Sequence, residues 1–164
     1  MALFDAFLKI DGIEGESADA KHKGEIHIES FSWGLAQTGV SATGGGGGAG
    51  KVHFHDIHFV KKTDSSSPLL MLNCANGSHI KEANVVVRKA GGEQLEYLKI
   101  KLTDVLISSY KEHGAVTGTD SIPTESISLN FAKVEYQYQP QGADGKAQGG
   151  PIMAGWDVKA NIKA

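Results

Sequence analysis

ESISLNFAKVEYQYQ, residues Glu125–Gln139, alternates apolar and polar side chains in two consecutive runs. The apolar positions of the first run are Ile127, Leu129 and Phe131, and those of the second, after a change of phase, are Val134, Tyr136 and Tyr138. A period of two residues is typical of a β-strand with one buried face. The stretch therefore predicts a long strand with one irregularity.

Similar alternation recurs on both sides of this stretch, so the sequence predicts a mainly β protein. One predicted strand, Glu25–Gly34, carries apolar residues on opposite faces, and a bulge near Glu29–Ser30 would bring them all to the core side. Several strands with one short helix indicate a β-barrel or β-sandwich. The other predicted strands are Ala6–Ile10, Val52–Val60, His79–Lys89, Gln94–Lys111 and Ile152–Ile162.

The segment TDSSSPLLMLNCANG, residues Thr63–Gly77, predicts that one helix, of about ten residues. A serine at the N-cap, Pro68 in the first turn and Gly77 after the end form a start and a stop signal. Cys74 is the single cysteine, which excludes an internal disulfide and a zinc site built on several thiolates. The expected apolar stripe of the helix consists of Leu69, Leu70, Leu72 and Cys74.

The length, net charge and hydrophobic pattern of the chain exclude several classes of function. A chain of 164 residues suits one domain, residues 1–164, with its own core. The net charge of −3 and the pI near 6.1 offer no basic surface for nucleic acid. No apolar run reaches the roughly 18 residues of a membrane span, so we expect no membrane insertion. The first residues lack the basic start of a secretory signal peptide, so we expect folding in the cytoplasm and export only by a signal-independent route.

The segment Gln37–Gly50 has no apolar periodicity and is rich in glycine, which predicts a long flexible loop. Within it, Gly45–Lys51 fits most of a phosphate-binding loop, G-x-x-x-x-G-K. That motif needs Ser or Thr after the lysine and a helix behind it, whereas Val52 follows here and opens a predicted strand. We therefore expect no nucleotide and no other cofactor.

Three histidines follow the glycines at spacings that suit a metal. His53 and His55 share one face of a strand, whereas His58 lies on the opposite face unless a bulge intervenes. A third ligand would have to come from a distant histidine or carboxylate that the sequence does not place. Histidines on the exposed face of a strand need no metal, so we expect no metal site, and an enzyme is the weaker class of function. A metal-dependent hydrolase using His53 and His55 remains the enzyme alternative.

Read together, several segments resemble the haemolysin-coregulated protein family, Hcp, of bacterial type VI secretion systems. They cover nearly the whole chain in the same order, and the helix start, the RKAGG turn and the GGP…GW segment are jointly specific. The matching segments are FLKIDGIEGES (7–17), SFSWG (30–34), GKVHFHDIHFVKKTDSSSPLL (50–70), NGSHIKEANVVVRKAGGEQLEYLKIKLTDVLISSY (76–110), LNFAKVEYQYQPQ (129–141) and GGPIMAGWDVKANI (149–162).

The resemblance implies a small antiparallel β-barrel of two sheets with one short flanking α-helix. It further implies a structural protein without catalytic residues, six copies of which form a ring. Rings of the family stack into a tube that is exported from the cell and carries effector cargo in its lumen. The implied partners are the sheath, the spike and the effectors of the apparatus, and a phage-derived tail tube protein is the alternative.

Two sets of residues are candidates for contact in such an assembly. Ser32 lies between Phe31 and Trp33, so strand alternation turns it away from the aromatic face, and we hypothesise that it faces the lumen and contacts cargo. The segment Gln37–Lys51 resembles the long family loop that reaches a neighbouring subunit or ring. The inter-subunit candidates are Gln37, Thr38, Val40, Gly44, Gly45, Gly46, Gly47, Gly48 and Lys51.

Overall fold

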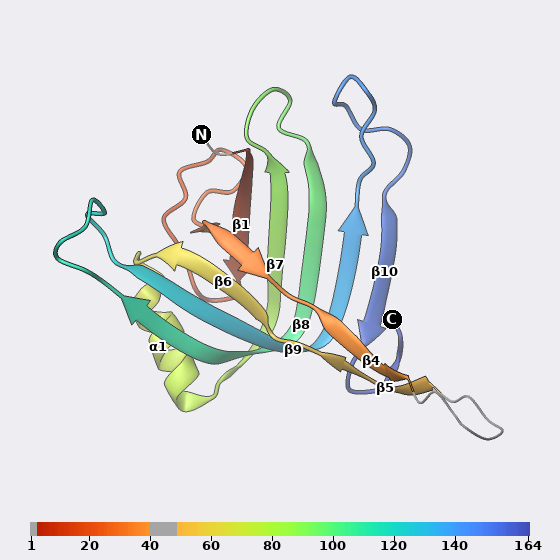
Figure 1. Ribbon diagram of the computed structural model, residues 1–164, viewed down its shortest axis with the longest axis horizontal. Helices are drawn as coiled ribbons and strands as arrows, with labels where there is room; N and C mark the ends of the chain where they lie inside the picture. The colour runs from red at the N-terminus through yellow and green to blue at the C-terminus, as the bar shows by residue number, and fades with distance from the viewer. Residues whose placement is uncertain (1–2, 40–48) are drawn as a thin grey trace.

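The computed structural model describes residues 3–39 and 49–164, and these residues form a mainly β protein, as the sequence predicts. Figure 1 shows curved strands with a single helix on one flank. The elements are β1 (Phe4–Ile10), β2 (Ile26–Ile28), β3 (Ser30–Ser32), β4 (Leu35–Gly39), β5 (Ala49–Phe54), β6 (Ile57–Lys62), α1 (Ser67–Asn76), β7 (His79–Lys89), β8 (Glu96–His113), β9 (Thr124–Tyr138), β10 (Ile152–Asp157) and β11 (Ile162–Lys163).

All the strand pairs are antiparallel. Nine strands are joined in one hydrogen-bonded sheet, and β4 and β5 form a separate two-stranded sheet. Within the nine strands we call the path β11-β10-β9-β8-β7-β1-β2 the first sheet and the path β3-β6-β9-β8 the second sheet, so the long strands β8 and β9 belong to both. β9 pairs with β6 through Thr124–Leu129 and with β10 through Lys133–Tyr138. The irregularity predicted from the change of phase therefore lies where β9 exchanges one neighbour for another.

The predicted barrel is not closed by a continuous ladder of hydrogen bonds. β2 pairs with β1, whereas β3, the next strand along the chain, pairs with β6 in the other sheet. Glu29 joins β2 to β3, and its backbone N–H donates to the Val60 carbonyl oxygen at 2.9 Å. At the position of the predicted bulge, the chain instead turns a corner at which it leaves one sheet and enters the other.

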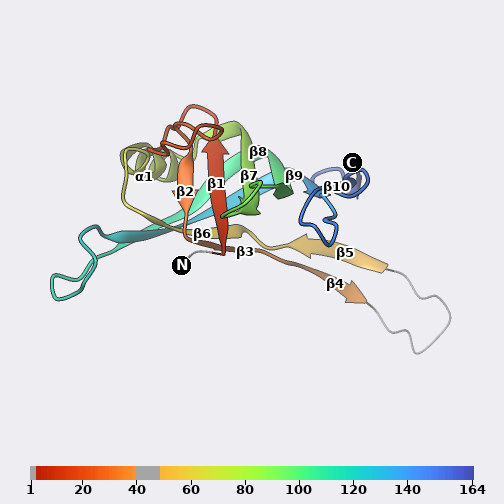
Figure 2. The same ribbon diagram turned by 90° about the horizontal axis from the view of Figure 1, so that it is seen from above.

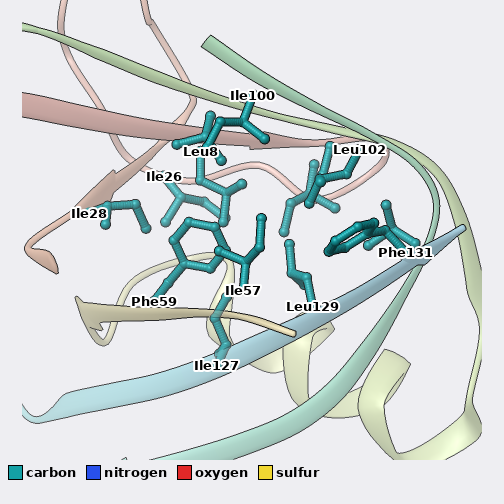
Figure 3. Close-up of a cluster of buried hydrophobic side chains, with 14 of the residues drawn as sticks. Leu8, Ile26, Ile28, Ile57, Phe59, Ile100, Leu102, Ile127, Leu129 and Phe131 are labelled. Carbon is teal, nitrogen blue, oxygen red and sulfur yellow. The ribbon is translucent and has the colours of Figure 1, made fainter. Parts of the chain in front are cut away.

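The two sheets enclose one cluster of buried apolar side chains, which is drawn in Figure 3. Alternate residues of each strand point inward, and Phe59, Leu102 and Leu129 have no exposed surface. Phe31 and Trp33 pack against the edge of this cluster and are partly buried. Burial of apolar side chains stabilises the fold by roughly 1.5–3 kcal/mol for each fully buried Leu, Ile or Phe.

Helix α1 begins after Ser66 and ends at Gly77, as the start and stop signals predict, but its predicted apolar stripe is wrong. Leu70 is fully buried and Cys74 packs against the core, whereas Leu69 and Leu72 are exposed. A helical repeat of 3.6 residues explains this result, because it puts positions i, i+3 and i+7 on one face. The inward residues are Ser67, Leu70 and Cys74.

A buried ionic group fixes α1 to the second sheet. The Lys61 ammonium, which has no exposed surface, donates to Asp64 Oδ1 at 2.9 Å and to a carboxylate oxygen of Glu125. Ser67 Oγ and the Tyr110 hydroxyl also donate to Glu125, at 2.7 and 2.8 Å. Burial, together with hydrogen bonds to carboxylates, raises the pKa of the Tyr110 hydroxyl. We call these five residues the anchor cluster.

A second ionic group holds the segment 14–24 against β1 and β7. Phe7 lies between the His22 ring, at 4.3 Å between centroids, and the Arg88 guanidinium, 4.9 Å from its centroid. Arg88 donates to Asp5 and Asp19, and its hydrogen bond lowers the pKa of Asp19 to about 2.

This pKa predicts how the stability depends on pH. The pKa of the Asp19 carboxyl is near 3.8 when unperturbed and about 2 in the folded protein. Its contribution to the free energy of unfolding is therefore fully present above pH 3.8 and is lost as the pH falls through about 2. An Asp19→Asn variant is therefore expected to be less stable than the unmodified chain at pH 7, with the difference shrinking towards pH 2. Urea unfolding at several pH values measures this difference. A constant difference would contradict the assignment.

Candidate functional site

The outward face of the second sheet is rich in hydroxyl groups, and we call it the hydroxyl face. Register places Ser32 of β3 beside His58 of β6, which pairs in turn with Ser128 of β9, and Ser128 pairs with Ser109 of β8. The next row contains Ser30 and Ser126 at the equivalent positions. The hydroxyl face consists of Ser30, Ser32, His58, Val60, Lys62, Ser109, Lys111, His113, Thr124, Ser126 and Ser128. Ser128 itself is only 2% exposed.

Ser32 is exposed on this face, while its neighbour Phe31 packs against the core. The structure therefore confirms that the Ser32 side chain points outward, as strand alternation predicts. The lumen assignment of Ser32 stays a prediction.

Hydrogen bonds fix some of the serines at the bend of the sheet. A bulge in β8 between Ile107 and Ser109 exposes Ser108, whose hydroxyl donates to Asp56 Oδ2 at 2.6 Å. The hydroxyls of Ser108 and Ser128 lie 2.7 Å apart, and Asn130 Nδ2 donates to Asp56 Oδ1 at 2.9 Å. Asp56 thereby ties the start of β6 to β8 and β9.

The outward face of the first sheet is chemically different, because it carries paired charges. Lys101 Nζ lies 3.0 Å from Glu82 Oε1 and 4.0 Å from Glu135 Oε2. The hydrogen bond to Lys101 lowers the pKa of Glu82 and raises the pKa of Lys101. The two outward faces of the molecule therefore suit different contacts.

The second sheet has two strand edges without a hydrogen-bonded neighbour within residues 3–39 and 49–164. β3 pairs only with β6, and Ser109–His113 of β8 pair only with β9. Such edges present free backbone N–H and C=O groups to another chain.

The predicted long loop is in part a β-hairpin, which corrects that expectation. β4 and β5 pair with one another and extend from the body toward one end of the longest axis (Figures 1 and 2). Gln37 and Thr38 lie in β4 and Lys51 lies in β5, all exposed. Gly50 packs so closely on Thr38 that a β-carbon would clash with it. The other candidates, Val40 and Gly44–Gly48, lie outside the described residues.

An apolar groove with a volume of about 570 Å³ lies between this hairpin and the strands β9 and β10. Trp33 and Tyr136 stack in its wall with ring centroids 5.8 Å apart. Leu35 at the groove is 53% exposed. The indole Nε1 of Trp156 is buried without a hydrogen-bond partner among the described residues.

The histidines do not come together as a metal centre in the described part of the chain. The rings of His53, in β5, and His55, directly after β5, lie 5.4 Å apart and are exposed. Strand β5 ends at Phe54. His58 lies in the next strand, β6, which belongs to a different sheet from β5. Residues 3–39 and 49–164 contain no group of three histidine, cysteine, aspartate or glutamate residues that could hold a metal ion.

Sequence reasoning found Ser32 but missed its neighbours on the hydroxyl face. Ser126 and Ser128 alternate with Ile127 in the opening stretch, which is the signal that could have identified them. Only the strand register shows that these serines and Ser32 share one surface.

Comparison with known proteins supports the family resemblance over nearly the whole chain. The family model described as "Type VI secretion system effector, Hcp" matches residues 7–138. Protein hcp1 of Pseudomonas aeruginosa is 47% identical over 161 residues, which is 98% of each chain. The crystal structure of Hcp1 from Salmonella typhimurium has 37% identity and a TM-score of 0.82, covering 99% of this chain and 100% of that one.

A solved structure of a type six secretion system protein has 31% identity and a TM-score of 0.92, covering 98% of this chain and 99% of the other. No helix within the described ranges is long and apolar enough to span a membrane. With the family model matching more than half of its residues, this chain belongs to the Hcp family of type VI secretion system proteins.

Proposed function

We propose that this chain is the structural tube subunit of a type VI secretion system, without catalytic activity. Six copies form a ring, the rings stack into the exported inner tube, and the hydroxyl face lines the lumen, where it contacts effector cargo. The partners are further copies of this chain together with the sheath, spike and effector proteins. The subunits assemble in the cytoplasm and leave the cell with the tube by a signal-independent route.

The observation that carries the proposal is a sheet whose outward face carries five exposed or partly exposed hydroxyl residues, Ser30, Ser32, Ser109, Thr124 and Ser126. Its two edges, β3 and the end of β8, have no hydrogen-bonded neighbour among the described residues. Free edges on opposite sides of one sheet allow copies to add side by side, and a constant rotation between neighbours closes such a contact into a ring. The sheet faces of the copies would then form one continuous wall.

The chemistry of the hydroxyl face suits cargo that is held and later released. A hydrogen bond to a neutral hydroxyl contributes only about 0.5–1.5 kcal/mol, so each contact is weak. Several copies of each serine around a ring provide many such contacts at once. Neutral hydroxyls also select less by charge than the paired lysines and glutamates of the other outward face.

The hairpin of β4 and β5 is proposed to contact a neighbouring subunit or ring. Its two strands carry the candidates Gln37, Thr38 and Lys51 away from the body, where another copy reaches them.

Native mass spectrometry of the purified chain, with metal analysis of the same sample, tests the proposal. We expect a hexamer of about six times 17.4 kDa without bound metal. A monomer with one zinc ion per chain would instead favour the hydrolase alternative with His53 and His55. Neighbouring genes for a sheath and an ATPase would distinguish a secretion system from a phage tail tube.

A further inference from the structure

Helix α1 has an exposed apolar face that its own chain does not cover. None of its ten residues, SPLLMLNCAN, is charged. A helix with apolar residues on its outward face as well as on its inward face is normally covered on both faces. Only the face with Leu70 and Cys74 packs on the core here, and Met71 and Leu72 are each 50% exposed. The outward stripe has the spacing i, i+3, i+4, i+7 and consists of Pro68, Met71, Leu72 and Ala75.

The apolar groove is a concave surface of the kind that accepts such a helix. Its walls include aromatic rings from both sides, and its rim carries the exposed Leu35. Helices that dock in grooves insert side chains at the spacing of the α1 stripe. The groove lining used here is Trp33, Leu35, Val52, Phe54, Tyr136 and Trp156.

The two surfaces lie at opposite ends of the molecule. α1 flanks one end of the longest axis, and β4 and β5 extend toward the other end in both views (Figures 1 and 2). One chain therefore cannot insert its own helix into its own groove. A second copy placed head to tail brings the helix of one chain to the groove of the next, as a heterologous contact requires.

We propose that α1 of one subunit docks in the groove of the next copy, with Met71 and Leu72 packed on the wall formed by Trp33 and Tyr136. The occupant of the groove is a second copy of this chain. This inference rests on the proposed ring and adds a second contact between its subunits, at the ends of the longest axis, to the contact proposed for the strand edges. It also explains why an uncharged helix with exposed leucines stays on the outside of the subunit.

A charge exchange between the two surfaces tests the docking. Met71→Glu and Leu35→Lys each place a charge in an apolar contact, so each variant is expected to dissociate to monomers at protein concentrations where the unmodified chain is a ring. The double variant brings the opposite charges together and is expected to restore part of the ring population. Native mass spectrometry at several concentrations measures these populations. Val116→Glu, in the exposed loop 114–123, is the matched control and is expected to form normal rings.

Disulfide cross-linking checks the contact directly. In a Cys74→Ser background, Met71→Cys and Leu35→Cys on one chain are expected to link neighbouring subunits into a ladder under oxidation. The pair Met71→Cys and Val116→Cys is expected to give no ladder.

The outcomes separate this docking from the ring itself. Normal rings of Met71→Glu would overturn the docking and leave the tube function standing. Ring loss without rescue by Leu35→Lys and without cross-links would place α1 in another contact and also overturn it. A monomeric unmodified chain would overturn the tube function and the docking together.

Discussion

Rings of a Ser32→Arg variant are expected to keep their subunit number and to lose more than about tenfold in bound cargo. Ser32 is exposed on the outward face of β3, so the arginine does not enter the core. Six copies would project six long cations from the hydroxyl face. A penalty of only about 0.25 kcal/mol at each subunit sums to about 1.5 kcal/mol, which is more than tenfold in affinity. Quantitative mass spectrometry of the proteins that co-purify with the rings measures the loss.

Gln137→Arg is the matched control for this variant. Gln137 lies in β9, also on an outward face, but on that of the first sheet among the charged residues. Its rings are expected to retain cargo at the level of the unmodified chain. Undiminished cargo on Ser32→Arg rings would contradict the assignment of the hydroxyl face to the lumen.

A Lys61→Met variant is expected to lose about 3–5 kcal/mol in its free energy of unfolding. Removal of the ammonium leaves the Glu125 carboxylate, which is 1% exposed, inside the protein without its cation. An uncompensated buried charge is among the most destabilising features that a single substitution creates. The anchor cluster also holds Ser67 in the first turn of α1, so the helix is expected to loosen with it.

Urea unfolding at one fixed protein concentration measures this loss. Lys62→Met is the matched control, because Lys62 is partly exposed and forms surface ion pairs worth about 0–1 kcal/mol. The double variant Lys61→Met, Glu125→Leu removes both charges and is expected to be more stable than Lys61→Met alone. A Lys61→Met protein as stable as the Lys62→Met control would show that the carboxyl does not need its partner.

The sequence predicts strands well where one face is buried, and poorly where the backbone alone forms the pair. His79–Lys89 has the predicted bounds because it contains three consecutive β-branched valines, of which Val85 and Val87 are buried. Thr38, Gly39, Ala49 and Gly50 have small or polar side chains, so β4 and β5 could not be distinguished from a loop, although backbone hydrogen bonds pair them. The stripe of α1 was misplaced for a related reason. A helix with apolar residues on both its inner and its outer face, such as α1, gives no pattern that separates the two faces.

The candidate site was predictable one residue at a time but not as a surface. Alternation around Phe31 gives the direction of Ser32, because that property is local. The row formed by Ser32, His58, Ser128 and Ser109 depends on which strands are neighbours and in which register. These pairings join residues far apart in the chain, and many registers are compatible with the same alternation.

The sharing of β8 and β9 between the two sheets has a mechanical consequence. A force on the hydroxyl face is transmitted to the opposite sheet along the covalent backbone of these two strands. The sheets therefore cannot separate by losing side-chain contacts alone, because separation also requires breaking the backbone hydrogen bonds that β8 and β9 make with their neighbours. Under the proposed export, the two sheets would bear the load as one unit.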